Sequence, residues 1–95
     1  MKIIKRNGSE ADFDINKIIR AVSRANDAVS EHERLTQMQI ERIAKSVVLS
    51  CEQLGRSPSV EEVQDMVEKM IMAHGTFEVA KTYITYRYKR ALVRQ

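Results

Sequence analysis

The chain begins with a short stretch in which apolar and polar positions alternate on either side of a turn signal. That signal is Asn7-Gly8, two residues that tolerate the positive φ of a two-residue type I′ turn. The alternation predicts a β-hairpin over residues 2–13, with Lys5 opposite Glu10 as a favourable cross-strand charge pair. Because a lone hairpin is only marginally stable in water, it must pack on the rest of the chain.

The same alternation assigns the hairpin side chains to two faces. With a two-residue turn, Ile4, Ala11 and Phe13 share one face. Ile3 and Lys5 share the other face. The pattern therefore predicts that one apolar residue and one cation lie side by side, opposite the larger apolar group.

Four segments with apolar residues at helical spacing follow the hairpin. The first begins after Asp14, a good N-cap, and fades near residues 28–29. The last runs from about Phe77 to the C-terminal end. Its expected inward residues are Ala80, Tyr83, Ile84, Ala91 and Leu92.

Capping boxes predict the starts of the second and third helices. Thr36 with Gln39 opens the second, and Ser59 with Glu62 opens the third. Gly55 is placed to end the second helix as its C′ residue. The apolar positions of the second helix are Met38, Ile40, Ile43, Val47, Leu49, Cys51 and Leu54. Those of the third are Val60, Val63, Met66, Val67, Met70 and Ile71.

These segments predict a single α+β domain, mostly α, over residues 1–95. A β-hairpin lid (2–13) packs on a four-helix bundle (14–94). The third helix is expected to stop at Gly75, and the short connections favour antiparallel neighbours.

Composition narrows the class of protein. The one cysteine, Cys51, cannot form an internal disulfide, and the absence of paired cysteines argues against structural zinc. A cytoplasmic location is expected, with no membrane association, because no apolar run approaches the length of a membrane span. The net charge of +3 permits an anionic partner but is low for a dedicated nucleic-acid binder.

Catalytic chemistry has little support in the sequence. His32 and His74 fall in or beside predicted connections, without a nucleophile in a recognised motif. The pair Glu61-Glu62 is explained by the favourable placement of negative charge at a helix N-terminus. We therefore expect a protein that is not an enzyme.

An anion-binding site is one interpretation of the hairpin tip. Lys5 and Arg6 adjoin the turn, and Lys17 lies one turn into the first helix. Cations that converge from several elements suit a triphosphate, because phosphate oxygens accept several charge-assisted hydrogen bonds. The alternative is a solvated hairpin tip, and the segment is not a Walker A loop.

The basic run from Tyr86 to Arg94 suggests a second function, nucleic-acid binding with stacked aromatics. Against it, Tyr86 and Tyr88 are two residues apart and do not share a helix face, and Tyr83 is expected in the core. A third possibility is an interaction domain with an exposed face at Met66, Met70 and Met72. Those methionines are better explained as core packing.

Four motifs in order carry a family resemblance. They are I-x-K-R-N-G-S at 3–9, F-D-I-x-K-I at 13–18, P-S-V-E-E-V-Q at 58–64 and A-K-x-Y-I-x-Y-R at 80–87. Together they resemble the ATP-cone, a nucleotide-sensing domain at the N-terminus of ribonucleotide reductases. The last motif is most similar to the anaerobic (class III) enzymes. A transcriptional repressor of reductase genes also carries an ATP-cone, but behind a zinc ribbon whose CxxC motifs are missing here.

The resemblance implies a β-lid over a four-helix bundle that binds ATP or dATP between them, with Mg²⁺ on the triphosphate. It implies allosteric regulation of the catalytic domain or subunit of a ribonucleotide reductase, with dATP inhibiting and ATP restoring activity. The readout in such proteins often involves oligomerisation, so a homo-oligomer is a possible assembly. The domain itself performs no chemistry.

The resemblance also implies roles for individual residues. Ile3 packs against the base or ribose, and Lys5 and Arg6 hold phosphates from the lid. Lys17 reaches the phosphates from the first helix, with Arg20 one turn later as a further candidate.

The remaining implied contacts come from the third and fourth helices. Val60 and Gln64, one turn apart, contact base or sugar. Lys89 completes the phosphate cluster.

Overall fold

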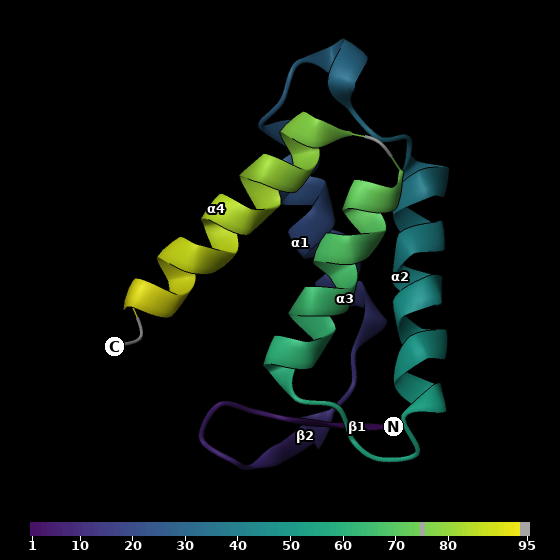
Figure 1. Cartoon of the computed structure of the whole chain (residues 1–95), viewed down its shortest axis with the longest axis vertical. Coiled ribbons are helices and arrows are strands. Elements are labelled where there is room, and N and C mark those ends of the chain that lie inside the picture. The colour runs from purple at the N-terminus through teal and green to yellow at the C-terminus, as the bar shows by residue number, and fades with distance from the viewer. Residues whose placement is uncertain (75, 94–95) are drawn as a thin grey trace.

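A β-hairpin lies at one end of four packed helices in the computed structural model, which describes residues 1–74 and 76–93 (Figure 1). The elements are β1 (Lys2–Ile4), β2 (Glu10–Asp12), α1 (Ile15–Asp27), a 3-10 turn η1 (Glu31–Glu33), α2 (Gln37–Gln53), α3 (Val60–Ala73) and α4 (Phe77–Val93). The predicted α+β, mostly helical class is confirmed. The expected helix stop at Gly75 and the last cation of the basic run, Arg94, lie outside the described residues.

The helix starts follow the capping signals of the sequence. The Asp14 side chain accepts a hydrogen bond from the backbone N–H of Asn16 at 2.9 Å. The capping boxes that begin at Thr36 and Ser59 are both complete. Gly55 has φ +70°, the left-handed conformation expected one residue beyond the α2 C-cap. These local signals fix where the helices begin and where α2 ends.

The hairpin turn is one residue longer than predicted. Lys5 donates its backbone N–H to the Ser9 carbonyl at 2.8 Å, and Gly8 donates to the Lys5 carbonyl at 2.9 Å. Gly8 alone in the loop has positive φ, +86°, so Asn7 does not adopt the type I′ conformation. The Asn7 side chain accepts hydrogen bonds from the Ser9 N–H (3.0 Å) and hydroxyl (2.7 Å). These bonds favour a three-residue loop with glycine in its last position.

The longer turn shifts the register of the strands by one residue. Ile3 lies opposite Ala11 and Ile4 opposite Glu10, so the predicted Lys5–Glu10 pair is wrong. A one-residue slip turns every side chain of one strand to the other face. Ala11 therefore lies on the same face as Ile3 and Lys5, whereas the sequence pattern predicts the opposite face for it. Phe13, two residues later on the chain, also lies on the face of Ile3 and Lys5.

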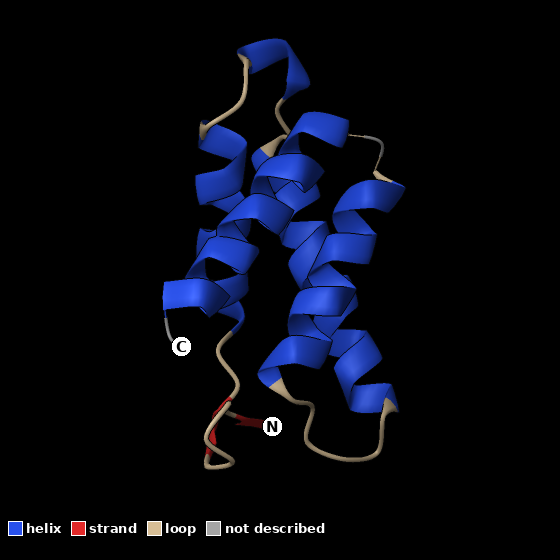
Figure 2. Cartoon of the chain, turned by 60° about the vertical axis from the view of Figure 1, so that its left-hand side comes forward, coloured by secondary structure: helices blue, strands red, loops and turns tan. Residues whose placement is uncertain are grey.

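The hairpin is anchored to the bundle through the loop before α3. Ile4 donates its backbone N–H to the Pro58 carbonyl at 2.8 Å and forms a parallel bridge with Ser59. Pro58 is among the most completely buried residues. This contact supplies the packing that an isolated hairpin lacks, and Figure 2 shows the hairpin below the ends of the helices.

The core receives side chains from all four helices. Its buried helical members are Ile18, Val22, Ala25, Ile40, Ile43, Ala44, Val47, Cys51, Val63, Val67, Ile71, Val79, Ala80 and Tyr83. Five predicted inward positions are exposed instead: Met38, Leu49, Leu54, Ile84 and Leu92. On α4 the apolar residues that face the core are Val79, Ala80 and Tyr83, and the far end of the helix diverges from α3 (Figure 1).

No described helix combines the length and the apolar character that crossing a membrane requires.

Candidate functional site

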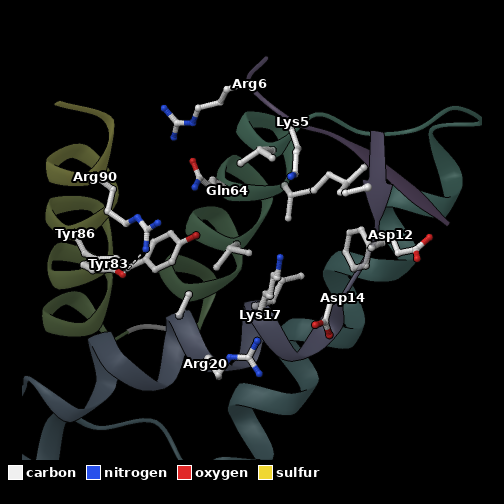
Figure 3. Close-up of a pocket in the computed structure, with 18 of the residues that line it drawn as sticks. Lys5, Arg6, Asp12, Asp14, Lys17, Arg20, Gln64, Tyr83, Tyr86 and Arg90 are labelled. Carbon is white, nitrogen blue, oxygen red and sulfur yellow. Dashed lines mark hydrogen bonds between the residues drawn. The ribbon is translucent and has the colours of Figure 1, made fainter. Parts of the chain in front are cut away.

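A pocket of about 730 Å³ lies where the hairpin meets α1, α3 and α4 (Figure 3). This volume is within the range of pockets that hold small organic ligands. The apolar part of its wall consists of Ile3, Ala11, Phe13, Ile18, Ala21, Val60, Val63 and Val67. Ile18, Val63 and Val67 also belong to the core, so the pocket has a rigid apolar floor.

The rest of the wall is strongly cationic. Six cations line the pocket: Lys5 and Arg6 from the hairpin loop, Lys17, Arg20 and Arg24 from α1, and Arg90 from α4. The lining carboxylates are Asp12 and Asp14. Positive charge therefore exceeds negative charge at the site, and much of the basic character of the chain is gathered there.

Both carboxylates already have partners. Asp12 accepts a hydrogen bond from the Lys2 amine at 2.6 Å, and this contact lowers the pKa of Asp12. Asp14 caps the start of α1. Neither carboxylate forms a salt bridge with a pocket cation in the part of the chain that is described. Among the described residues, Arg6 is the one pocket cation that forms a salt bridge, with Glu61, so most of the positive charge of the pocket is left for a ligand.

The α1 cations follow one face of the helix. Lys17, Arg20 and Arg24 are three and four residues apart, a spacing that places them in one row along the pocket. At the Lys17 end the row meets the hairpin, and Figure 3 shows the Lys5 and Lys17 amines approaching the same space from opposite sides. At the Arg24 end it meets α4.

A cluster of paired charges borders the pocket between α3 and α4. Glu61 forms a salt bridge with Arg6 at 2.9 Å through one carboxylate oxygen and accepts a hydrogen bond from Arg87 at 2.9 Å with the other. Arg87 also pairs with Asp65 at 2.8 Å and Glu68 at 3.2 Å. Burial lowers the pKa of Arg87, but hydrogen bonds to Glu61 and Asp65 outweigh it and the pKa is raised. The cluster connects the hairpin to both helices.

Seven of the eight residues predicted for nucleotide binding line this one pocket: Ile3, Lys5, Arg6, Lys17, Arg20, Val60 and Gln64. Lys89, the eighth, is an exposed residue of α4 outside the lining. The α4 cation at the pocket is its neighbour Arg90.

Sequence reasoning missed a group at the α1–α4 edge of the pocket, formed by Arg24, Tyr86 and Arg90. The Tyr86 hydroxyl accepts from Arg24 Nη1 at 3.1 Å and from Arg90 Nη1 at 3.0 Å. The hydrogen bond from Arg90, followed by that from Arg24, lowers the pKa of Tyr86. The Arg90 guanidinium also lies 5.7 Å from the centre of the Tyr86 ring. The i, i+4 spacing of Tyr86 and Arg90 was the available signal.

The basic run of α4 is divided between different surroundings. Tyr83 is buried as predicted, Tyr86 faces the pocket and Tyr88 is 66% exposed. Arg87, only 17% exposed, is held by carboxylates of α3. The aromatic side chains therefore do not form one platform on which bases could stack.

The other chemistry-bearing residues are dispersed. Cys51 is buried, and burial raises the pKa of its thiol. His74 lies at the end of α3, with Nδ1 2.8 Å from the Met70 carbonyl oxygen. Over residues 1–74 and 76–93, no three His, Cys, Asp or Glu side chains are grouped as metal ligands.

A family model for the ATP cone domain matches residues 1–92. Over 99% of its length the chain is 38% identical to a vitamin B12-dependent ribonucleoside-diphosphate reductase of Thermoplasma acidophilum, of which it spans 12%. It is 34% identical over 98% of its length to an anaerobic ribonucleoside-triphosphate reductase of Haemophilus influenzae, of which it spans 13%. It is 32% identical over 99% of its length to a ribonucleoside-diphosphate reductase subunit alpha of Chlamydia trachomatis, of which it spans 10%.

Proposed function

This chain belongs to the ATP-cone family, and from that premise we propose that its lid pocket binds ATP or dATP and regulates a ribonucleotide reductase. The domain senses a nucleotide and carries out no reaction. The reductase would be the rest of the same polypeptide or a partner subunit, since the chain spans only 10–13% of the three reductases named above.

One observation carries the proposal: the same pocket has an apolar side and a cationic side. A nucleoside triphosphate has the matching division, with a flat, weakly polar base at one end and a dense chain of negative charge at the other. Ile3, Phe13 and Val60 supply the apolar side. Lys5 and Lys17, from opposite walls, supply cations that can donate to phosphate oxygens.

Gln64 is oriented for a polar contact with the ligand. Arg87 Nε donates to Gln64 Oε1 at 3.0 Å. Since a guanidinium cannot accept a hydrogen bond, this contact fixes which end of the amide faces Arg87. The two N–H donors of Gln64, a residue of the pocket lining, form no hydrogen bond with another described residue. We propose that they donate to a sugar hydroxyl or a phosphate oxygen.

Mg²⁺ would arrive with the triphosphate. Magnesium sites in nucleotide-binding proteins commonly use one or two carboxylates and the phosphates of the ligand. The two lining carboxylates do not fit this arrangement, because Asp12 is paired with Lys2 and Asp14 caps α1. We therefore assign the coordination of Mg²⁺ to phosphate oxygens and water.

Isothermal titration with ATP, dATP and GTP tests the proposal directly. We expect heat of binding from ATP and dATP at sub-millimolar concentration and weaker binding of GTP. Absence of binding by both adenine nucleotides would reject the nucleotide-sensing function.

A charge-matched pair of variants tests the site. Lys5→Gln with Lys17→Gln removes two cations that line the pocket, and affinity should fall by about tenfold or more. Lys45→Gln with Lys69→Gln removes the same charge from exposed positions of α2 and α3 outside the lining. Equal losses in both variants would mean that only the overall charge matters, and the site assignment would be wrong.

The partner is best tested in the full-length protein. All three reported relatives are reductases, which favours a reductase over a transcriptional repressor as the recipient of the signal. Activity of the intact enzyme should respond to dATP and ATP in opposite directions, and light scattering would report any change in homo-oligomerisation. A cytoplasmic location follows from this role and fits the lone thiol of Cys51.

A further inference from the structure

Within the lid pocket we infer a terminal-phosphate subsite, formed by Arg24 and Arg90 around Tyr86, that selects nucleoside triphosphates over diphosphates. This inference rests on the proposed nucleotide binding and assigns to these three residues a role in specificity. It is carried by the arrangement of two guanidinium groups around one neutral acceptor.

The first step concerns charge. Arg24 and Arg90 donate to the same phenol oxygen, at 3.1 and 3.0 Å, so two positive groups lie close together. In the described part of the chain neither arginine forms a salt bridge. Like charges held together without a counter-charge repel each other, and an anion bound between them would remove that cost.

The second step concerns hydrogen-bonding capacity. A guanidinium has five N–H donors in a planar fork. Among the described residues, each of these two side chains donates one hydrogen bond, to Tyr86, and uses one nitrogen for it. The remaining donors are available to oxygen atoms of a ligand, and a phosphate group presents oxygens in a geometry that the fork matches.

The third step concerns position along the pocket. Lys17 and Arg24 are seven residues apart on α1, about 10 Å along the helix axis, with Arg20 between them. A phosphate chain that begins between Lys5 and Lys17 can extend along this row toward Arg24 and Arg90. A diphosphate ends one phosphate earlier and leaves the Arg24–Arg90 end of the row unused.

Calorimetry with ATP and ADP at constant ionic strength tests this subsite. The informative variant is Arg24→Gln with Arg90→Gln, since both side chains are exposed and lie outside the core. We expect its affinity for ATP to fall by about tenfold or more, as for hydrogen bonds to a charged group, and its affinity for ADP to change by less than about threefold. The preference of the wild type for ATP over ADP should largely disappear.

Two further variants make the result specific. Arg42→Gln with Lys45→Gln removes the same charge from exposed positions of α2 and should leave both affinities unchanged. Arg24→Lys with Arg90→Lys keeps the charge but loses the fork, and should retain only part of the preference for ATP.

The outcomes separate the two proposals. If wild type binds ATP and ADP but the Gln variant keeps the same ratio of affinities, the subsite is wrong and the nucleotide-binding function stands. Parallel losses of both affinities would also overturn it, because the two arginines would then serve the pocket as a whole. If wild type binds neither nucleotide, the proposed function fails and the subsite fails with it.

Discussion

Two arginines three residues apart on α4 have opposite surroundings. Arg87 is 17% exposed and bonded to carboxylates of α3, namely Glu61, Asp65 and Glu68. Arg90 is exposed, lines the pocket and shares a phenol oxygen with another arginine. The comparison separates cations whose charge is neutralised within the fold from cations whose charge remains for a ligand. Counting basic residues in the sequence does not make this distinction.

The largest effect should come from breaking the salt bridges of Arg87. Arg87→Met keeps much of the apolar stem but leaves three carboxylates without their common partner. We expect a loss of about 2–3 kcal/mol of stability, which for a domain of this size lowers Tm by about 10 °C or more. Thermal unfolding followed by circular dichroism measures it.

The matched control is the same change one turn later on the same helix. Arg90→Met removes no salt bridge among the described residues and relieves repulsion with Arg24, so Tm should stay within a few degrees of wild type. Similar destabilisation by Arg87→Met and Arg90→Met would show that the two positions do not differ as the structure indicates.

Arg6 connects the pocket to the salt-bridge cluster of Arg87 and gives the next prediction. It lines the pocket, yet it is bound to Glu61 at 2.9 Å. Glu61→Gln weakens that salt bridge and frees the guanidinium for phosphate, so affinity for ATP should rise by up to about fivefold. Glu68→Gln also weakens the network of Arg87 but does not contact Arg6, and its affinity should match wild type. Equal effects of the two substitutions on affinity would show that Arg6 does not contribute to ligand binding.

The elements that sequence predicted well are those controlled by neighbouring residues. Asp14, Thr36 and Ser59 cap helices through bonds to residues two or three positions away, and Gly55 ends α2 by its own conformation. The hairpin register is also local, but two signals competed there. Asn-Gly favours a two-residue turn, whereas the hydrogen bonds from the Asn7 side chain to Ser9 stabilise a longer one.

The part of the site that sequence could not predict depends on how helices cross. Successive residues on a helix differ by about 100° in direction, so the angle of α4 decides whether Lys89 or Arg90 faces the pocket.

The partners of Arg87 left a signal in the sequence that could have been used. Glu61, Asp65 and Glu68 follow one face of α3 at spacings of four and three residues, and such an acidic row favours a basic side chain packed against it.

A third paired arginine tests whether exposure or pairing decides the energetic effect. Arg56 forms a two-pronged salt bridge with Glu62, at 2.9 and 2.6 Å, on the solvent side of α3. The bond from Arg56 and then that from the Ser59 backbone lower the pKa of Glu62 from 4.5 to about 2. A lowered carboxyl pKa stabilises the fold above the ordinary value, and this contribution is lost as pH falls from 4.5 toward 2.

Glu62→Gln should therefore reduce the loss of stability over that acidic range. Glutamine can still cap α3, as Gln39 does for α2, so only the ionised contact is removed. Denaturant unfolding at several pH values compares the two proteins. An unchanged pH dependence would mean that the pair contributes nothing measurable, as for many exposed salt bridges.

The smallest effect concerns the pKa of Tyr86. It reports on Arg24 and Arg90, which form no salt bridge among the described residues, and it does not perturb the fold. Its pKa is lowered by the hydrogen bonds from Arg90 and Arg24, whereas burial raises the pKa of Tyr83 to about 12. Arg90→Gln should move the titration of Tyr86 toward higher pH while that of Tyr83 stays in place. A triphosphate bound to both arginines should shift the pKa of Tyr86 in the same direction, since it neutralises the charge that favours phenolate.

Near-ultraviolet phenolate absorbance follows the titration, and Tyr86→Phe identifies which transition belongs to Tyr86. If Arg90→Gln leaves the Tyr86 titration unchanged, the two guanidinium groups do not converge on its hydroxyl in solution, and the contrast between Arg87 and Arg90 loses its basis.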